Sequence, residues 1–211
     1  MKLAADNCFA TLFFCCSIRK KGELFMKVKT VDIWNDELWQ DVSSLYIEAF
    51  GDKGAKPVKI IKNMFAQGIA ELYVGYNESA AVAMALTGRL ASDKVMIIDY
   101  LAVSENERGH GLGKQLVEYL RQKAIAAGYQ KLLIEAESEE TPENKRRIQF
   151  WQSCGFVLTE YVHHYIWVPE TYHAMYLPLT ADSKKTTGEE LFVFINAFHR
   201  LSFRGGGKKE G

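Results

Sequence analysis

Apolar residues along this chain repeat at two spacings, which predict alternating strands and helices. Residues 95–103 form an almost continuous apolar run, typical of a strand that is buried on both faces. Shorter apolar runs predict further strands at 27–33, 71–76, 81–90, 131–136, 156–167 and 172–179. Apolar residues spaced three and four apart predict helices at 36–50, 57–67, 114–127, 142–154 and 189–203. This order predicts an α/β domain with one mixed sheet and helices on both of its faces.

A glycine-rich loop separates the 95–103 strand from the helix that follows it. Gly109, Gly111 and Gly113 carry no Cβ, so a ligand can approach the backbone N–H groups closely. These groups lie at a helix N-terminus, where unpaired amides and the helix dipole favour an anion. The loop is therefore predicted to hold a phosphate or pyrophosphate. A tight corner between a strand and a helix is the alternative interpretation of the same glycines.

The spacing of this loop excludes two well-known nucleotide-binding motifs. A Walker loop needs a glycine where Arg108 stands, and a serine or threonine where Gln115 stands. The dinucleotide-binding pattern G-x-G-x-x-G fails in both registers, because Lys114 and Leu116 stand at the third glycine position. A second motif is therefore needed to interpret the loop.

Two motifs in the right order carry a family resemblance. The first is Arg108-x-x-Gly111-x-Gly113, directly after the strand residues 101–103. The second lies at 141–156 and matches N-x-x-x-x-x-[FL]-Y-x-x-x-G-F at Asn144, Phe150, Gly155 and Phe156. The chain thereby resembles the GNAT superfamily of acetyl-CoA-dependent N-acetyltransferases over residues 27–179. Trp151 stands where the second motif of that family has a tyrosine.

The resemblance implies a fold and a cofactor site. In this family the mixed, mostly antiparallel central sheet is splayed at the cofactor slot, where acetyl-CoA binds as the co-substrate; no metal is implied. The backbone of Leu101, Ala102 and Val103 is expected to pair with the pantetheine arm, and Asn144 to form a hydrogen bond with it. The pyrophosphate is expected to contact the loop residues Arg108, Gly109, His110, Gly111, Leu112, Gly113 and Lys114.

The implied reaction is attack of an amine on a thioester, which needs a base more than an acid. An alkylammonium with a pKa of about 10.4 lies roughly 4.6 kcal/mol from its neutral form at pH 7, whereas a thiol of pKa about 8.5 lies about 2 kcal/mol from its thiolate. Asp99 interrupts an apolar strand, where an unpaired carboxylate is costly, and Glu135 and Glu137 share one strand face. We expect Glu137 and Asp99 to be the catalytic residues. For Asp99, a carboxylate bonded to a neighbouring strand or loop is the alternative.

Trp151 leaves the general acid open, because an indole N–H cannot supply a proton near neutral pH. Either the thiolate leaves unassisted, or Tyr161 or Tyr165 supplies the proton, or the protein is not a catalyst.

The sequence therefore leaves two candidate functions. The first is an N-acetyltransferase whose unidentified primary amine belongs to a small amine, an amino acid or a protein N-terminus. The second is a non-catalytic acyl-CoA-binding module. The acidic run 135–140 suits a cationic acceptor, although such runs are commonly solvated loops.

Charge and cysteine usage limit the binding partners and the cellular location that the sequence predicts. The 211 residues carry 26 basic and 26 acidic side chains, so no overall field favours nucleic acid or an anionic membrane. No apolar run approaches the roughly 20 residues of a transmembrane helix. Three of the four cysteines lie within residues 1–25 and Cys154 stands alone, so no disulfide framework is expected and a cytoplasmic location is favoured. His163 and His164 point to opposite faces of a strand and cannot bind one metal together.

We expect one GNAT-like domain over residues 26–180. Residues 1–25 form an extension that we interpret as lying upstream of a natural start at Met26. Residues 181–211 are expected to comprise a polar linker, an amphipathic helix and a disordered tail. The apolar face of this helix is expected to pack on its own domain; packing on a second copy, in a homodimer, is the alternative.

Overall fold

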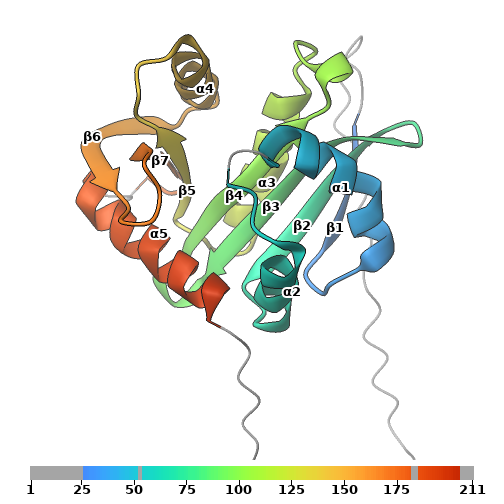
Figure 1. Ribbon diagram of the computed structural model, residues 1–211, viewed down its shortest axis with the longest axis horizontal. Coiled ribbons are helices and arrows are strands. Elements are labelled where there is room, and N and C mark those ends of the chain that lie inside the picture. The colour runs from blue at the N-terminus through green and yellow to red at the C-terminus, as the bar shows by residue number, and fades with distance from the viewer. Residues whose placement is uncertain (1–25, 52–53, 182–184, 205–211) are drawn as a thin grey trace, which may run out of the picture.

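The strands form one sheet of order β1-β2-β3-β4-β5-β7-β6 (Figure 1). The computed structural model describes residues 26–51, 54–181 and 185–204. Within these ranges, all neighbouring strands are antiparallel except β4 and β5. The mixed, mostly antiparallel sheet expected above is therefore confirmed. The strands are β1 (Lys27–Val31), β2 (Ala70–Asn77), β3 (Ala80–Leu90), β4 (Val95–Val103), β5 (Lys131–Glu137), β6 (Val157–His164) and β7 (Thr171–Pro178).

Helices cover both faces of this sheet, as the pattern of strands and helices predicts (Figure 1). On one face lie α1 (Asp36–Phe50), α2 (Val58–Ala66) and α5 (Gly188–Phe203). On the other lie α3 (Leu112–Ala126) and α4 (Pro142–Ser153). Two short 3-10 helices, η1 (Ala91–Asp93) and η2 (Glu105–Glu107), stand before and after β4.

Local sequence signals set where the helices near the slot begin. The hydroxyl of Thr141 accepts a hydrogen bond from the backbone N–H of Asn144 (3.1 Å) and caps α4. Helix α3 begins at Leu112, earlier than the predicted residue 114. The reason is that Gly111, with φ of +82°, ends the loop directly before it.

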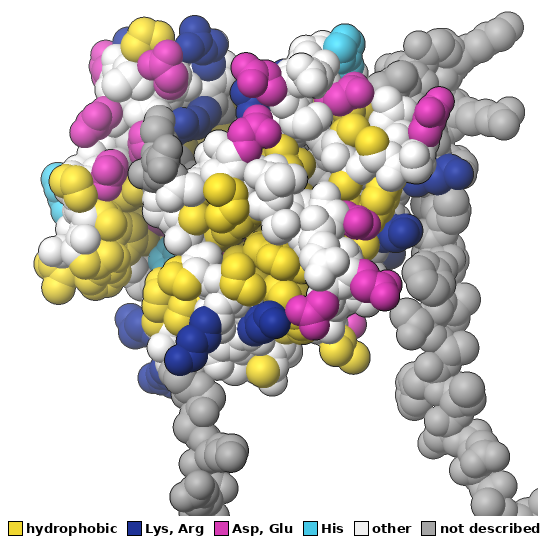
Figure 2. Space-filling model, turned by 45° about the vertical axis from the view of Figure 1, so that its right-hand side comes forward, with side chains coloured by type: hydrophobic (Ala, Val, Ile, Leu, Met, Phe, Trp, Pro, Cys, Tyr) yellow, Lys and Arg dark blue, Asp and Glu magenta, His cyan; other side chains and the backbone are white. Residues whose placement is uncertain are grey.

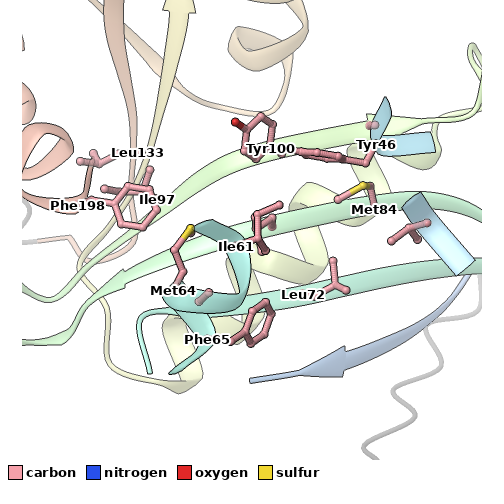
Figure 3. Packing of buried hydrophobic residues seen from close by; sticks show 14 of the residues in the cluster. Tyr46, Ile61, Met64, Phe65, Leu72, Met84, Ile97, Tyr100, Leu133 and Phe198 are labelled. Atoms are coloured by element: carbon pink, nitrogen blue, oxygen red, sulfur yellow. The ribbon is translucent and has the colours of Figure 1, made fainter. Parts of the chain in front are cut away.

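Two hydrophobic cores hold the strands in place, one on each face of the sheet. A fully buried large apolar side chain contributes about 1.5–3 kcal/mol, so each core is a substantial source of stability. The core beneath α1, α2 and α5 is shown in Figure 3 and includes Tyr46, Ile61, Met84, Ile97 and Phe198. The core beneath α3 and α4 includes Leu112, Leu116, Leu120, Ile134 and Phe156.

The C-terminal helix α5 belongs to the first of these cores. Its residues Leu191, Ile195 and Phe198 are fully buried, and Phe198 lies beside Ile97 of β4 (Figure 3). A Cβ at Gly88 of β3 would lie 2.2 Å from the Phe198 ring, so only glycine leaves room for that ring. The helix therefore packs on its own domain, as expected.

A β-bulge in β4, in its pairing with β3, lies next to the point where β4 and β5 stop pairing. These two strands pair only over residues 95–97 and 131–133. Directly beyond, Ile98 lies opposite Thr87 and Tyr100 lies opposite Leu86, which leaves Asp99 as an extra residue on β4. A bulge bends the strand that contains it. Strand β4 therefore turns away from β5 at Asp99, and the sheet is splayed there, as the family resemblance implied (Figure 1).

The surface carries both signs of charge. Acidic and basic side chains are interspersed over much of the face drawn in Figure 2, in keeping with their equal numbers. Among the helices of the described ranges, none is long and apolar enough to cross a membrane. Cys154 has a free thiol, whereas the expected extension 1–25, with the other three cysteines, and the expected tail 205–211 lie outside the described residues.

Candidate active site

The slot between β4 and β5 forms a pocket of about 940 Å³. Its walls come from the C-terminal end of α1, from β4, from the glycine-rich loop, and from β5, α4 and β7. Pockets of roughly 300–1,000 Å³ are typical of small-molecule and cofactor sites. Most of the predicted cofactor-binding residues line it: Leu101, Ala102, Val103, Arg108, Gly109, Gly111, Gly113 and Lys114.

The glycine-rich loop presents open backbone to this pocket. Gly109 and Gly111 have φ angles of +84° and +82°, and a Cβ added at either would meet no atom within 4 Å. The first backbone N–H groups of α3 have no partner within the helix. Arg108 donates from Nε to the carbonyl oxygen of Val103 (3.1 Å), which ties the loop to the end of β4. With Lys114 also in the wall, the loop offers an anion two cations and free amide donors.

Three predicted cofactor residues do not line the pocket. His110 is exposed, and the side chain of Leu112 is buried in the core, so Leu112 can offer a ligand only its backbone. Asn144 is buried; its side chain donates to the carbonyl oxygen of Glu139 (3.2 Å) and accepts from Arg147 (3.1 Å). Asn144 thus reaches the pocket wall through Arg147.

Gly113 has a packing role in addition to its place in the pocket wall. A Cβ at this position would lie 3.2 Å from the ring of Phe150 on α4. The glycine therefore lets α3 and α4 approach each other closely at the pocket.

Asp99, at the bulge, forms a buried ion pair with Lys56. The Lys56 Nζ lies 2.6 Å and 2.7 Å from the two carboxylate oxygens, and the two side chains are only 7% and 5% exposed. The ammonium also lies over the rings of Tyr100 and Phe198, at 5.1 Å and 5.5 Å from their centroids. The expected catalytic residue Asp99 therefore lines the pocket with both of its oxygens bonded.

Glu135 lies on β5 across the slot and is held by two hydrogen bonds. Its Oε1 accepts from the Tyr165 hydroxyl (2.6 Å), and its Oε2 lies 2.7 Å from His199 Nε2 on α5. Burial alone would raise the pKa of Glu135, but the hydrogen bond and charge of His199, the Tyr165 hydrogen bond and the charge of Lys56 hold it below the usual value. Glu135 is thus ionised at neutral pH.

Glu137, the other expected catalytic residue, lines the pocket two residues beyond Glu135. Its Oε1 lies 3.3 Å from Arg147 Nη1, and its side chain is 28% exposed. Strand alternation places Glu135 and Glu137 on one face of β5. The structure thereby brings three carboxylates to the slot, with Asp99 on one strand and the two glutamates on the other.

Trp151 fills the position of the family tyrosine with an apolar ring. It lies in the pocket wall and packs edge-on against Phe150 and Phe156, with centroid distances of 5.1 Å and 5.0 Å. Neither of the tyrosines named above as alternative acids lines the pocket: the Tyr165 hydroxyl donates to Glu135, and the Tyr161 hydroxyl lies 3.4 Å from His163 Nδ1.

Two other tyrosines do line the pocket. Burial and the neighbouring charges of Glu170 and Glu137 raise the pKa of Tyr172 to about 12. Tyr100 donates to the carbonyl oxygen of Gly54 (3.0 Å), and burial raises its pKa far above the usual value.

The sequence analysis missed Lys56, Tyr172 and His199. No local pattern marks Lys56 or His199, because each meets its partner across a long stretch of chain, 43 and 64 positions respectively. Tyr172 could have been found, since strand alternation places it on the buried face of Ala174 and Tyr176, at the slot end of β7.

Comparison with known proteins places this arrangement in a family. Residues 36–156, more than half of the chain, match the acetyltransferase (GNAT) family. This chain belongs to the GNAT acetyltransferase family. The matched segment runs from the start of α1 through the glycine-rich loop to the end of the second motif, so it contains the β4–β5 slot. Membership implies acyltransferase activity.

Solved structures share the GNAT fold at low sequence identity. A Bacillus subtilis acetyltransferase in complex with CoA is 18% identical, with a TM-score of 0.54 over 74% of this chain and 99% of that one. The protein yncA from Salmonella typhimurium, solved with its cofactor acetyl-CoA, is 15% identical, with a TM-score of 0.57 over 76% and 98%. The ribosomal-protein-S18-alanine N-acetyltransferase from Escherichia coli is 16% identical, with a TM-score of 0.54 over 75% and 98%. No curated protein matches the sequence.

Proposed function

We propose that this GNAT protein transfers the acetyl group of acetyl-CoA to a primary amine. The observation that carries the proposal is the pocket itself, because it joins an anion-binding loop at one end to three carboxylates at the splayed strands. A loop of this kind suits the phosphates of a nucleotide-type cofactor, and carboxylates suit an amine. Similar structures from Bacillus subtilis and Salmonella typhimurium contain CoA or acetyl-CoA.

The residues of the pocket fit acetyl-CoA. The open space beside Gly109 and Gly111 leaves room for a pyrophosphate against the backbone, with Arg108 and Lys114 as its counter-charges. The backbone of residues 101–103 lies beyond the three paired residues of β4 and β5 and lines the slot, where the pantetheine arm would lie. The thioester of acetyl-CoA supplies the acetyl group.

The nitrogen has to lose two protons between the ammonium ion and the amide, and the chain has to stabilise one developing negative charge. The neutral amine attacks the thioester carbonyl carbon, the N–C bond forms, and the C–S bond breaks with the electron pair leaving on sulfur. We assign Glu137 as the base that takes the proton of the incoming ammonium. We expect backbone N–H groups near residues 101–103 to stabilise the oxyanion. As the C–S bond breaks, the nitrogen gives its second proton to solvent, and the leaving thiolate takes a proton from solvent, since Trp151 cannot provide one.

Asp99 is the second candidate base, and its surroundings favour a structural role. The Lys56 ammonium lies 2.6 Å and 2.7 Å from the two Asp99 oxygens in a pair that is less than a tenth exposed, whereas Arg147 approaches one oxygen of Glu137 at 3.3 Å and Glu137 is 28% exposed. The pair fixes the bend of β4 at the point where the slot opens.

Trp151 favours one alternative function, a non-catalytic acyl-CoA-binding module, because it removes the hydroxyl of the family motif. The two functions are separated by following CoA release from acetyl-CoA in the presence of three probes: a simple alkylamine, an amino acid and a peptide with a free N-terminus. Acetyl transfer to one of them, identified by mass spectrometry, supports the transferase. Calorimetric binding of acetyl-CoA without transfer to any of them supports the binding module.

A further inference from the structure

Helix α5 reaches the slot although it lies outside the segment that matches the GNAT family. That segment ends at residue 156, whereas α5 spans Gly188–Phe203. Through His199 the helix contacts Glu135, which lines the pocket on β5. The His199 and Glu135 side chains are only 19% and 18% exposed, so the contact is largely shielded from water.

The partners of Glu135 differ from those of the two other carboxylates in the slot. Asp99 is paired with Lys56 and Glu137 with Arg147, both of which are cations with fixed charge at neutral pH. Glu135 instead accepts one hydrogen bond on each oxygen, from a tyrosine hydroxyl and from an imidazole. Each oxygen of a carboxylate can accept about two hydrogen bonds, so both retain acceptor capacity.

The apolar surroundings of these groups come from both ends of the slot. Phe50 at the end of α1, Tyr100 on β4 and Tyr172 on β7 line the same pocket. Such a wall suits the carbon part of an alkylamine.

We propose that Glu135 binds the acceptor as an ammonium ion, and that His199 and Tyr165 are positioning residues that hold the Glu135 carboxylate toward the slot. The proposal rests on the transferase function above and narrows its acceptor to an alkylamine that is cationic at neutral pH. The ammonium then loses its proton to Glu137, on the same face of β5, before it attacks. The low pKa of Glu135 agrees with this division, because an ionised carboxylate that is a weak base binds a cation better than it removes a proton.

The test compares two probes of nearly the same shape, benzylamine, which is a cation at pH 7, and benzyl alcohol, which is neutral. Binding of each to the protein saturated with CoA is measured by calorimetry, so the result does not depend on turnover. The variants are Glu135→Gln, His199→Leu, His199→Gln and Tyr165→Phe. Arg200→Gln is the matched control, because Arg200 is the exposed neighbour of His199 on the same helix. Thermal unfolding and CoA affinity establish that each variant is folded.

We expect the native protein to prefer benzylamine by at least about 10-fold, since hydrogen bonds to charged groups are worth about 1.5–3 kcal/mol. Glu135→Gln should abolish the preference. His199→Leu and Tyr165→Phe should weaken it several-fold, whereas His199→Gln, which keeps an N–H donor, and Arg200→Gln should retain it. With the best acceptor of the transfer assay, His199→Leu should raise KM more than it lowers kcat.

Equal binding of the two probes by the native protein, or binding of neither, would overturn the proposal. So would a preference that survives in Glu135→Gln, or a His199→Leu variant that binds both probes as the native protein does. If the native protein selects benzylamine but transfers acetyl to no amine, the transferase function fails while the ammonium site stands. If the native protein transfers acetyl to an amine but does not prefer benzylamine, the ammonium site fails while the transferase function stands.

Discussion

The ion pair between Lys56 and Asp99 allows the two roles considered for Asp99 to be separated by measuring stability and turnover on the same variants. Lys56→Met leaves the Asp99 carboxylate in its buried position without its cation. Asp99→Asn leaves the ammonium of Lys56 between two aromatic rings without its anion. The double variant removes both charges at once.

The magnitude follows from the burial of the pair. Both side chains are less than a tenth exposed and both carboxylate oxygens are bonded, so solvent screens the pair little. Removing one partner of a buried pair costs about 3–5 kcal/mol. In a protein of this length, 1 kcal/mol corresponds to about 2–4 °C in Tm, so each single variant should melt about 6–20 °C lower. The loss of unfolding free energy in the double variant should be smaller than the sum of the two single losses by about 1 kcal/mol or more.

Urea unfolding at 25 °C gives these free energies, and acetyl transfer by the variants that remain folded gives the catalytic effect. If Asp99 is structural, Asp99→Asn should lower stability strongly and kcat less than tenfold. Single variants that lose less than about 1 kcal/mol, or a double variant whose loss equals the sum, would refute the reasoning about the pair. A stable Asp99→Asn variant without turnover would make Asp99 the base.

Three further predictions concern the loop and β5. Gly111→Ala should weaken acetyl-CoA binding at least tenfold, whereas the control Gly128→Ala should not. Both glycines have φ near +80° with open space around an added Cβ, but of the two only Gly111 lines the pocket. Equal affinities of the two variants by calorimetry would count against the pyrophosphate site. Glu137→Gln should lower turnover about 10²–10⁴-fold at pH 7 and recover much of it at high pH, where the amine is already neutral; a parallel loss at every pH would leave it a positioning role. Because the folded pKa of Glu135 lies below the reference value of 4.5, its charge adds stability that is fully present above that pH and is lost as the pH falls through the lower folded value. The Tm difference between the native protein and Glu135→Gln should therefore shrink as the pH falls below about 4.5; a constant difference between about pH 5 and pH 3 would contradict the lowered pKa.

Strands and helices were largely predictable because they are encoded locally. The apolar run 95–103 coincides with β4, and the helical spacing of residues 36–50 coincides with α1. The start of α3 was displaced because a positive φ at Gly111 cannot be read from apolar spacing. Most of the predicted cofactor residues line the pocket for the same local reason, since the glycine-rich loop is a short motif next to β4.

The partners of the slot carboxylates were not predictable, because they are tertiary contacts. Asp99 is recognisable in the sequence as a polar residue in an apolar strand, but nothing there indicates that it forms a bulge or that Lys56 neutralises it. The same holds for Glu135, whose hydrogen bond to His199 joins a central strand to the last helix. Only the folded chain shows which carboxylate is paired with a lysine or an arginine and which is held by a histidine and a tyrosine.

The packing of the Phe198 ring on Gly88 has a consequence for when the site can form during synthesis. The glycine-rich loop and all seven strands of the described sheet leave the ribosome before α5, and His199 follows Glu135 by 64 residues. Domains generally fold as units as they emerge during synthesis. The glycine-rich loop is therefore encoded and available early, whereas Glu135 gains its His199 partner only after α5 has been translated and Phe198 has packed on β3. A chain that ends within α5 before His199 would have every residue of the loop, but its Glu135 would lack the contact with His199.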